Sequence, residues 1–192
     1  MMMPIALAAA VLALGVSSSG RAAPQAPPAG SDPGNLTRFS RGLKSRFDSI
    51  KRDVVEAAEA VPENEYAFKP TPQVRSFGEL VGHIADAQNF FCGVASGSNP
   101  DYSDAIEKSK SPTKAALVSA LKASVAACDD VYAKTTAANA LELVKAGKGD
   151  ALRGMMLVDN ISHDNEHYGN IVTYMRLKGH VPPSTARMQK TQ

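Results

Sequence analysis

Four segments of this chain repeat apolar residues at intervals of three and four, and this spacing is the strongest constraint on its fold. It places the apolar side chains on one face of an α-helix, whereas a half-buried strand alternates apolar and polar residues. No segment of the sequence shows that strict alternation. The first helix is expected over residues 36–60, with Leu36, Phe39, Leu43, Phe47, Ile50, Val54 and Ala58 facing the core. We therefore expect an all-α chain.

The other three segments carry residues that are typical of helix ends. The second helix is predicted to begin at Ser76, because Ser76 and Glu79 have the spacing of a capping box. The third is predicted to begin at Ser111-Pro112, and the fourth to span about Asp150 to Lys178, where Gly179 can cap it. Helices that each carry one apolar face bury it by packing together, so the prediction is a four-helix bundle with long inter-helix connections.

The first 34 residues differ in composition from this helical region. An uninterrupted apolar run at residues 5–16 has the length of a signal-peptide core and is too short to span a bilayer. A Pro/Gly-rich stretch follows. We predict a signal peptide at 1–23, a linker at 24–34, a helical domain at 35–186 and a tail at 187–192, in a periplasmic or secreted protein without an integral membrane span. The alternatives are a misassigned start codon and a disordered leader.

Charge and cysteine content exclude some classes of function. The formal net charge is +2 and the basic residues are scattered, whereas a nucleic-acid-binding protein concentrates them on one face, so we expect no nucleic-acid partner. The two cysteines, Cys92 and Cys128, are too far apart in the sequence for a CxxC motif. Both lie about 16 residues into their predicted helices, the second and the third. Parallel helices would allow a disulfide and antiparallel helices would separate the sulfurs by about 20 Å, so the sequence leaves both arrangements open.

Three of the four histidines are candidate metal ligands. His163 and His167 are four residues apart on the predicted fourth helix, so both side chains lie on one face and can reach one ion. His83 lies at the edge of the apolar face of the second helix. The alternative is a set of surface or hydrogen-bonded core histidines. Together the three would form an open site for a divalent metal, for which we expect zinc or nickel, with iron or copper as alternatives.

Residues around these histidines suggest further roles. Glu166 is a candidate catalytic base, although an exposed helix-face carboxylate is the alternative. His163 to His167 also matches the HxxEH motif of inverted zinc peptidases, but no acidic residue follows Glu166 to act as the third ligand of those enzymes. Asp159 and Asn160 could orient His163, or could be plain polar helix positions. We expect His180 to be solvated. The expected pocket walls are Leu80, Ala87, Met156, Asn170 and Tyr174, with Phe90 and Phe91 in the core.

Two stretches of the sequence resemble the DinB-like family. The first is PExxYxFxPxPxVRSFGELxxHIA, from Pro62 to Ala85, and the second is HxxxHYGN followed by YMRxxGxxPP, from His163 to Pro183. The resemblance covers about residues 36–186. It implies a four-helix bundle that binds a divalent metal through the three matching histidines, often as a homodimer. Relatives of known activity are thiol S-transferases that use low-molecular-weight thiols, and many members have no known activity.

These features leave three hypotheses about function. The first is an exported, metal-dependent enzyme of the transferase or hydrolase kind that acts on a small molecule. The second is a non-catalytic, stress-related envelope protein that binds a metal or another ligand. The third is a structural bundle whose histidines bind nothing. Bound metal would exclude the third hypothesis, and turnover that depends on His167 would separate the first from the second.

Overall fold

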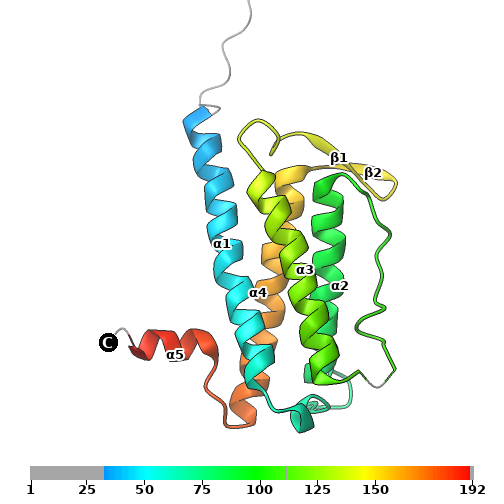
Figure 1. Cartoon of the computed structure of the whole chain (residues 1–192), viewed down its shortest axis with the longest axis vertical. Helices are drawn as coiled ribbons and strands as arrows, with labels where there is room; N and C mark the ends of the chain where they lie inside the picture. The colour runs from blue at the N-terminus through cyan, green and yellow to red at the C-terminus, as the bar shows by residue number, and fades with distance from the viewer. Residues whose placement is uncertain (1–32, 111, 191–192) are drawn as a thin grey trace, which may run out of the picture.

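The structure, a computed structural model, describes residues 33–110 and 112–190, and within these ranges it is mostly helical (Figure 1). It contains five α-helices, α1 (Pro33–Ala60), α2 (Phe77–Ser96), α3 (Lys114–Lys134), α4 (Arg153–Leu177) and α5 (Pro183–Lys190), a short 3-10 helix, η1 (Glu63–Glu65), and the strands β1 (Leu143–Ala146) and β2 (Gly149–Leu152). None of the described helices is both long enough and apolar enough to cross a membrane. The predicted signal peptide and nearly all of the predicted linker lie outside the described residues.

The four long helices α1–α4 lie side by side, with α2 packed against α3 and α4, and α1 packed against the same two helices (Figure 1). Their buried faces follow the predicted spacing from Leu43 onward in α1. Leu36 is only partly buried and Phe39 is 39% exposed. The first turns of α1 extend beyond the ends of the neighbouring helices (Figure 1), and the ring of Phe39 lies beside Gly154 at the start of α4.

Most of the predicted helix ends are found where the sequence placed them. The Ser76 side chain accepts a hydrogen bond from the Glu79 backbone N–H, and the Glu79 carboxylate accepts one from the Ser76 N–H, which is the predicted capping box. Gly179 has a φ of +80°, as expected of a glycine that ends a helix. The third helix begins two residues later than predicted, because Thr113 and not Ser111 is its N-cap and Lys114 is its first residue. Ser111 lies outside the described residues.

A β-hairpin between α3 and α4 corrects the prediction of an all-α chain. β1 and β2 pair antiparallel from Leu143↔Leu152 to Ala146↔Gly149, and the turn between them contains Gly147 at a φ of +59°. The strands have four residues each and are mostly exposed, so they carry no alternation of buried and exposed residues that the sequence could reveal. Because β2 takes up residues 149–152, α4 begins at Arg153 rather than at Asp150.

The C-terminal region also differs from the prediction. The expected boundary between domain and tail, at residues 186 and 187, falls inside α5. Arg187 of this helix forms ion pairs with Asp53 and Glu56 of α1. The segment therefore packs against α1, and it follows the end of α4 that lies opposite the hairpin (Figure 1).

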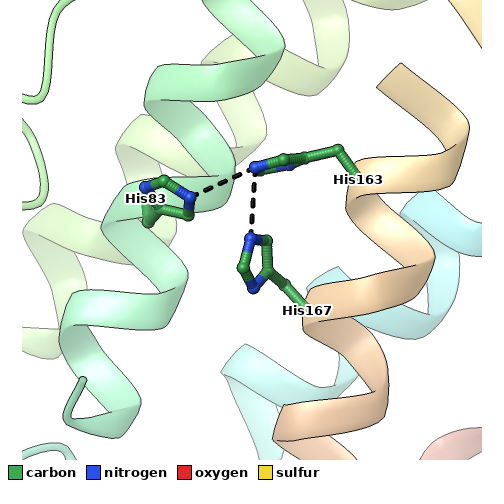
Figure 2. A group of neighbouring side chains, drawn as sticks. All are labelled: His83, His163 and His167. Carbon is green, nitrogen blue, oxygen red and sulfur yellow. Dashed lines mark hydrogen bonds between the residues drawn. The ribbon is translucent and has the colours of Figure 1, made fainter. Parts of the chain in front are cut away.

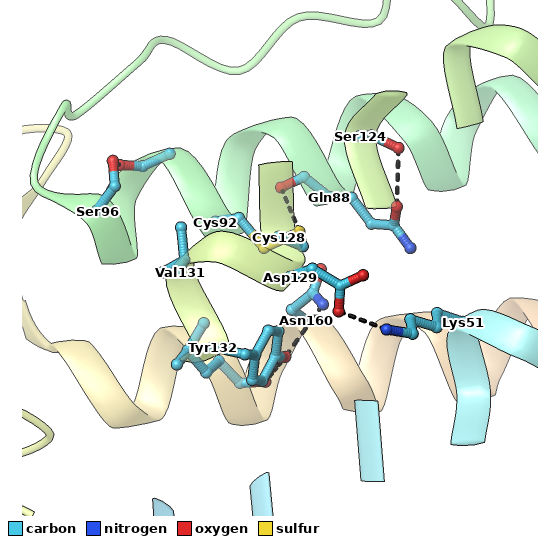
Figure 3. Close-up of a disulfide and its surroundings, with 12 residues drawn as sticks. Lys51, Gln88, Cys92, Ser96, Ser124, Cys128, Asp129, Val131, Tyr132 and Asn160 are labelled. Carbon is cyan, nitrogen blue, oxygen red and sulfur yellow. Dashed lines mark hydrogen bonds and ion pairs between the residues drawn. A yellow bond between two sulfur atoms is a disulfide. The ribbon is translucent and has the colours of Figure 1, made fainter. Parts of the chain in front are cut away.

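The helices α2 and α3 run parallel, because the connection between them returns along α2 over residues 97–110 (Figure 1). Cys92 and Cys128 therefore lie at the same height and form a disulfide with a Cα–Cα distance of 5.3 Å (Figure 3). This is the parallel alternative of the two that the sequence left open. Both cysteines are buried, at 2% and 0% exposure, so the bridge crosses the α2–α3 interface inside the core.

We predict that this disulfide contributes substantially to stability. It closes a loop with a sequence separation of 36 residues, and the loss of chain entropy in the unfolded state predicts a contribution of about 3–4 kcal/mol. Urea unfolding of the Cys92→Ala/Cys128→Ala variant should therefore give a free energy of unfolding lower by about that amount than for the oxidised protein. Equal stability of oxidised and reduced wild-type protein, with the bridge shown by thiol counting, would contradict this prediction.

Candidate metal centre

The three histidines that the sequence singled out converge between α2 and α4 (Figure 2). The Nε2 atom of His163 lies 3.1 Å from Nε2 of His83 and 3.1 Å from Nε2 of His167. One ring nitrogen from each histidine lies within 4.8 Å of those of the other two. His167 is 6% exposed, and the His83 side chain is 12% exposed. The three side chains that were predicted to share one ion therefore do lie together.

The spacing of these nitrogens fits a shared metal ion. Two nitrogen ligands about 2.1 Å from one ion, at a roughly right angle, are about 3 Å apart, and two of the three pairs have this spacing. The nitrogens of the third pair lie within 4.8 Å of each other. Ring nitrogens that present lone pairs to one another lack a donor, whereas one cation satisfies all of these lone pairs at once. The group is thus compatible with metal binding.

The outer nitrogens of the three rings have different surroundings. Nδ1 of His83 lies 2.8 Å from Oε2 of Glu107, and Nδ1 of His167 lies 3.3 Å from the side-chain amide of Asn170. Nδ1 of His163 is buried and has no hydrogen-bond partner in the described structure. Hydrogen bonds to the outer nitrogen fix the tautomer and the orientation of a metal-binding histidine. Of these contacts, the one between His83 and Glu107 is the shortest and involves a charged acceptor.

Two of the histidines are held in the neutral form that a metal ion requires. Burial, followed by the charges of His167 and His83, lowers the pKa of His163 to about 3. Burial, followed by the charge of His83, lowers the pKa of His167 to about 4. Beside them, burial raises the pKa of Asp164 to about 7, against the effect of its hydrogen bond from Gln88. At neutral pH these two imidazoles are therefore uncharged, and each keeps one ring nitrogen with a free lone pair.

A cavity of about 560 Å³ lies on the Glu107 and Asn170 side of the centre, and the three histidines themselves do not line it. Glu107 and Asn170, which contact the outer nitrogens of His83 and His167, both line it. The remaining lining residues are Lys69, Pro72, Gln73, Val74, Arg75, Glu79, Leu80 and Tyr174. Leu80, Asn170 and Tyr174 were predicted as pocket walls. Ala87 and Met156 were predicted there too, but they are 1% and 7% exposed, belong to the core side of their helices and do not line this cavity.

Several residues predicted near the centre have other surroundings. The amide of Asn160 is buried and donates to the hydroxyl of Tyr132, and Asp159 is exposed, so neither orients His163 (Figure 3). Glu166 is exposed, and in the described part of the chain no hydrogen bond or ion pair joins it to a histidine. His180 lies apart from the centre and is only partly exposed, because its Nε2 is 2.8 Å from Oε2 of Glu65.

Two residues of the connection between α2 and α3 contact His83 and were not predicted from the sequence. Glu107 and Tyr102 both belong to residues 97–113, and the Tyr102 hydroxyl lies 3.3 Å from Nδ1 of His83. Nothing in the spacing of a loop predicts such contacts. Phe91, which was predicted in the core, is partly buried and packs its ring 5.7 Å from that of His163. Phe90 is also partly buried and packs against Tyr102.

Comparison with known proteins identifies relatives of this fold. The model of the DinB superfamily matches residues 46–171. A DinB-like protein from Bacillus cereus is similar in structure, with a TM-score of 0.63 and 13% identity over 74% of this chain and 95% of that one. A DinB-like protein from Bacillus subtilis gives a TM-score of 0.59 and 22% identity over 73% and 93% of the two chains. A conserved protein from Enterococcus faecalis gives 0.56 and 17% over 72% and 95%. None of the curated proteins compared with the chain matches it significantly.

The lowered pKa of His163 predicts how the stability of the metal-free protein depends on pH. The unfolded chain binds a proton at this residue near pH 6.5, whereas the folded chain does so only near pH 3, so this stabilisation is full above pH 6.5 and is lost as the pH falls. Between pH 7 and pH 5, the free energy of unfolding should fall by about 1–2 kcal/mol more for wild type than for His163→Gln. The contribution of Asp164 is common to both proteins. Parallel pH profiles from urea unfolding would refute the prediction.

Proposed function

We propose that this chain, which belongs to the DinB superfamily, binds a divalent metal ion through His83, His163 and His167. In this proposal α1–α4 form the four-helix bundle that the resemblance implies, and the ion lies between α2 and α4. The convergence of the three Nε2 atoms, with two separations of 3.1 Å, is the observation that carries it. Three nitrogen ligands leave a coordination position open for water or for a substrate atom. Zinc and nickel are the expected metals.

The open position and the adjoining cavity support an enzyme that acts on a small molecule. A divalent ion held by three histidines supplies a Lewis acid that activates water or a thiol at neutral pH. The cavity of about 560 Å³ is large enough for a small organic substrate. Its charged lining, which includes Lys69, Arg75, Glu79 and Glu107, supplies polar contacts. We therefore propose a transferase-like or hydrolase-like reaction, with Glu166 as the candidate base from the same helix as two of the ligands.

The surroundings of Glu166 favour one alternative, a non-catalytic protein that binds or senses a metal or another ligand in the cell envelope. Glu166 is exposed and no hydrogen bond joins it to the three histidines. The two cations of the cavity wall are already paired, Lys69 with Glu79 and Arg75 with Glu107. Turnover that is lost in His167→Ala and retained in Glu166→Gln would support an enzyme without this base. Absence of turnover with bound metal would favour the alternative.

We also propose that the protein is exported. The apolar run at residues 5–16 is the first support, and the disulfide between Cys92 and Cys128 is the second, because disulfides persist in oxidising compartments. When expressed with its leader in a Gram-negative host, the protein should be recovered from the periplasm and should lack roughly its first 20–30 residues by mass spectrometry. Recovery of the full-length chain from the cytosol would contradict export.

A homodimer is the assembly that we propose. A groove of about 290 Å³ between α1 and α4 is lined by Phe39, Gly42, Leu43, Arg46, Val158 and Ile161, which leaves apolar surface for a second copy to cover. Phe39 is 39% exposed in the single chain, and Met155 nearby on α4 is 47% exposed. Light scattering after gel filtration should give twice the mass of one chain. The mass of a single chain at micromolar concentration would exclude a stable dimer.

Metal analysis of the protein purified without an affinity tag tests the central proposal. We expect about one equivalent of a divalent transition metal per chain for wild type. His83→Ala, His163→Ala and His167→Ala should each remain folded by circular dichroism, because the core faces of the helices do not depend on these side chains, and should lose metal affinity by orders of magnitude. His180→Ala is the matched control, because His180 lies apart from the centre. Equal metal content in all four variants would exclude the site.

A further inference from the structure

The connection between α2 and α3 brings one carboxylate, that of Glu107, against the candidate metal centre. We propose that Glu107 is a positioning residue of this centre, which holds His83 in the tautomer and orientation that metal binding requires. The inference rests on the proposed metal binding, and it gives residues 97–113 a role beyond joining two helices. It also explains why these helices run parallel, because only a connection that returns along α2 passes His83 (Figure 1).

The contact between Glu107 and His83 has the geometry of a hydrogen bond to the outer ring nitrogen. Oε2 of Glu107 lies 2.8 Å from Nδ1 of His83, and the two side chains are 13% and 12% exposed. A carboxylate only accepts hydrogen bonds, so Nδ1 carries the proton and Nε2 presents its lone pair to the centre. A negatively charged hydrogen-bond acceptor at Nδ1 also raises the basicity of Nε2, which makes the imidazole a stronger ligand for a cation. The other two histidines have no such partner in the described structure.

Two residues of α2 hold the backbone of Glu107 in place. Gly82, the residue before His83, lets the connection lie directly on the helix: a Cβ atom there would be 2.8 Å from Cα and 2.9 Å from the backbone nitrogen of Glu107. Asp86, one turn further on the same face, accepts hydrogen bonds from the backbone N–H groups of Ile106 and Glu107, the latter at 2.8 Å. The position of Glu107 is thus fixed by α2 itself.

Arg75 fixes the second oxygen of the same carboxylate. Its Nε donates to Oε1 of Glu107 at 2.8 Å, while its backbone carbonyl accepts a hydrogen bond from the Tyr174 hydroxyl of α4, also at 2.8 Å. Each oxygen of Glu107 therefore has its own partner, which prevents rotation of the carboxylate. An ion pair at the surface would need none of this support. The chain from Tyr174 through Arg75 and Glu107 to His83 joins the two helices that supply the metal ligands.

Competition titration of the purified protein with a chromophoric zinc chelator tests this role of Glu107. Glu107→Ala should bind Zn²⁺ about 10–100-fold more weakly than wild type. Glu107→Gln should lose less, because its amide oxygen still accepts the Nδ1 proton. Gly82→Ala, which displaces the connection without changing a charge, should also weaken Zn²⁺ binding. The matched control is Glu79→Gln, which removes a charge from the same cavity wall but contacts no histidine, and should bind Zn²⁺ like wild type.

A second measurement separates positioning from general stability. The visible spectrum of the Co²⁺-loaded protein reports the ligand geometry, so it should change in Glu107→Ala and stay as in wild type in Glu79→Gln, although Glu79 is part of the helix cap. Zinc affinity and a cobalt spectrum in Glu107→Ala that equal those of wild type would overturn the inference and leave the metal centre intact. An equal loss of Zn²⁺ affinity in Glu79→Gln would mean that Glu107 acts only through its charge, and this would also overturn the inference. If wild type binds neither ion, the proposed function fails first.

Discussion

The buried side chain of Gln88 sets the position of α2 relative to its two neighbours, and the candidate metal centre depends on that position. Gln88 is fully buried and donates to Oδ2 of Asp164 in α4 at 2.9 Å. It also accepts from the hydroxyl of Ser124 in α3 at 2.8 Å (Figure 3). Sliding α2 by one turn would leave these polar groups buried without partners, at a cost of about 1–3 kcal/mol each. Because Asp164 follows His163 directly, this contact also fixes the height at which His83 meets the α4 histidines.

Three sides of the helix α2 therefore make different contacts. The side of Gln88 and Cys92 joins it to α3 and α4, by hydrogen bonds and by the disulfide. His83 points toward the histidines of α4 (Figure 2). Gly82 and Asp86 receive the returning connection. The position of the candidate metal centre therefore depends on packing, because a change in any of these surfaces would move His83 relative to α4.

Much of this architecture could be predicted from the sequence, because it follows from local spacing. The helical segments, the capping box at Ser76 and the shared face of His163 and His167 depend on residues within one or two turns of each other. The β-hairpin could not be predicted in this way, since its short strands are mostly exposed. Nor could Glu107, whose contact with His83 depends on the direction of α3. The sequence left two roles open for Asn160, and only the structure shows that its amide donates to Tyr132 on another helix and does not orient His163.

X-ray absorption spectroscopy of the zinc-loaded protein tests the central claim most directly, because it counts the ligands of the ion and measures their distances. The three-histidine centre predicts three imidazole nitrogens at about 2.0–2.1 Å, with the multiple-scattering pattern of histidine rings, and one further oxygen ligand at the open position. His163→Ala should reduce the imidazole count or abolish binding. A spectrum dominated by carboxylate or water oxygens, with one imidazole or none, would contradict the assignment of the ion to His83, His163 and His167.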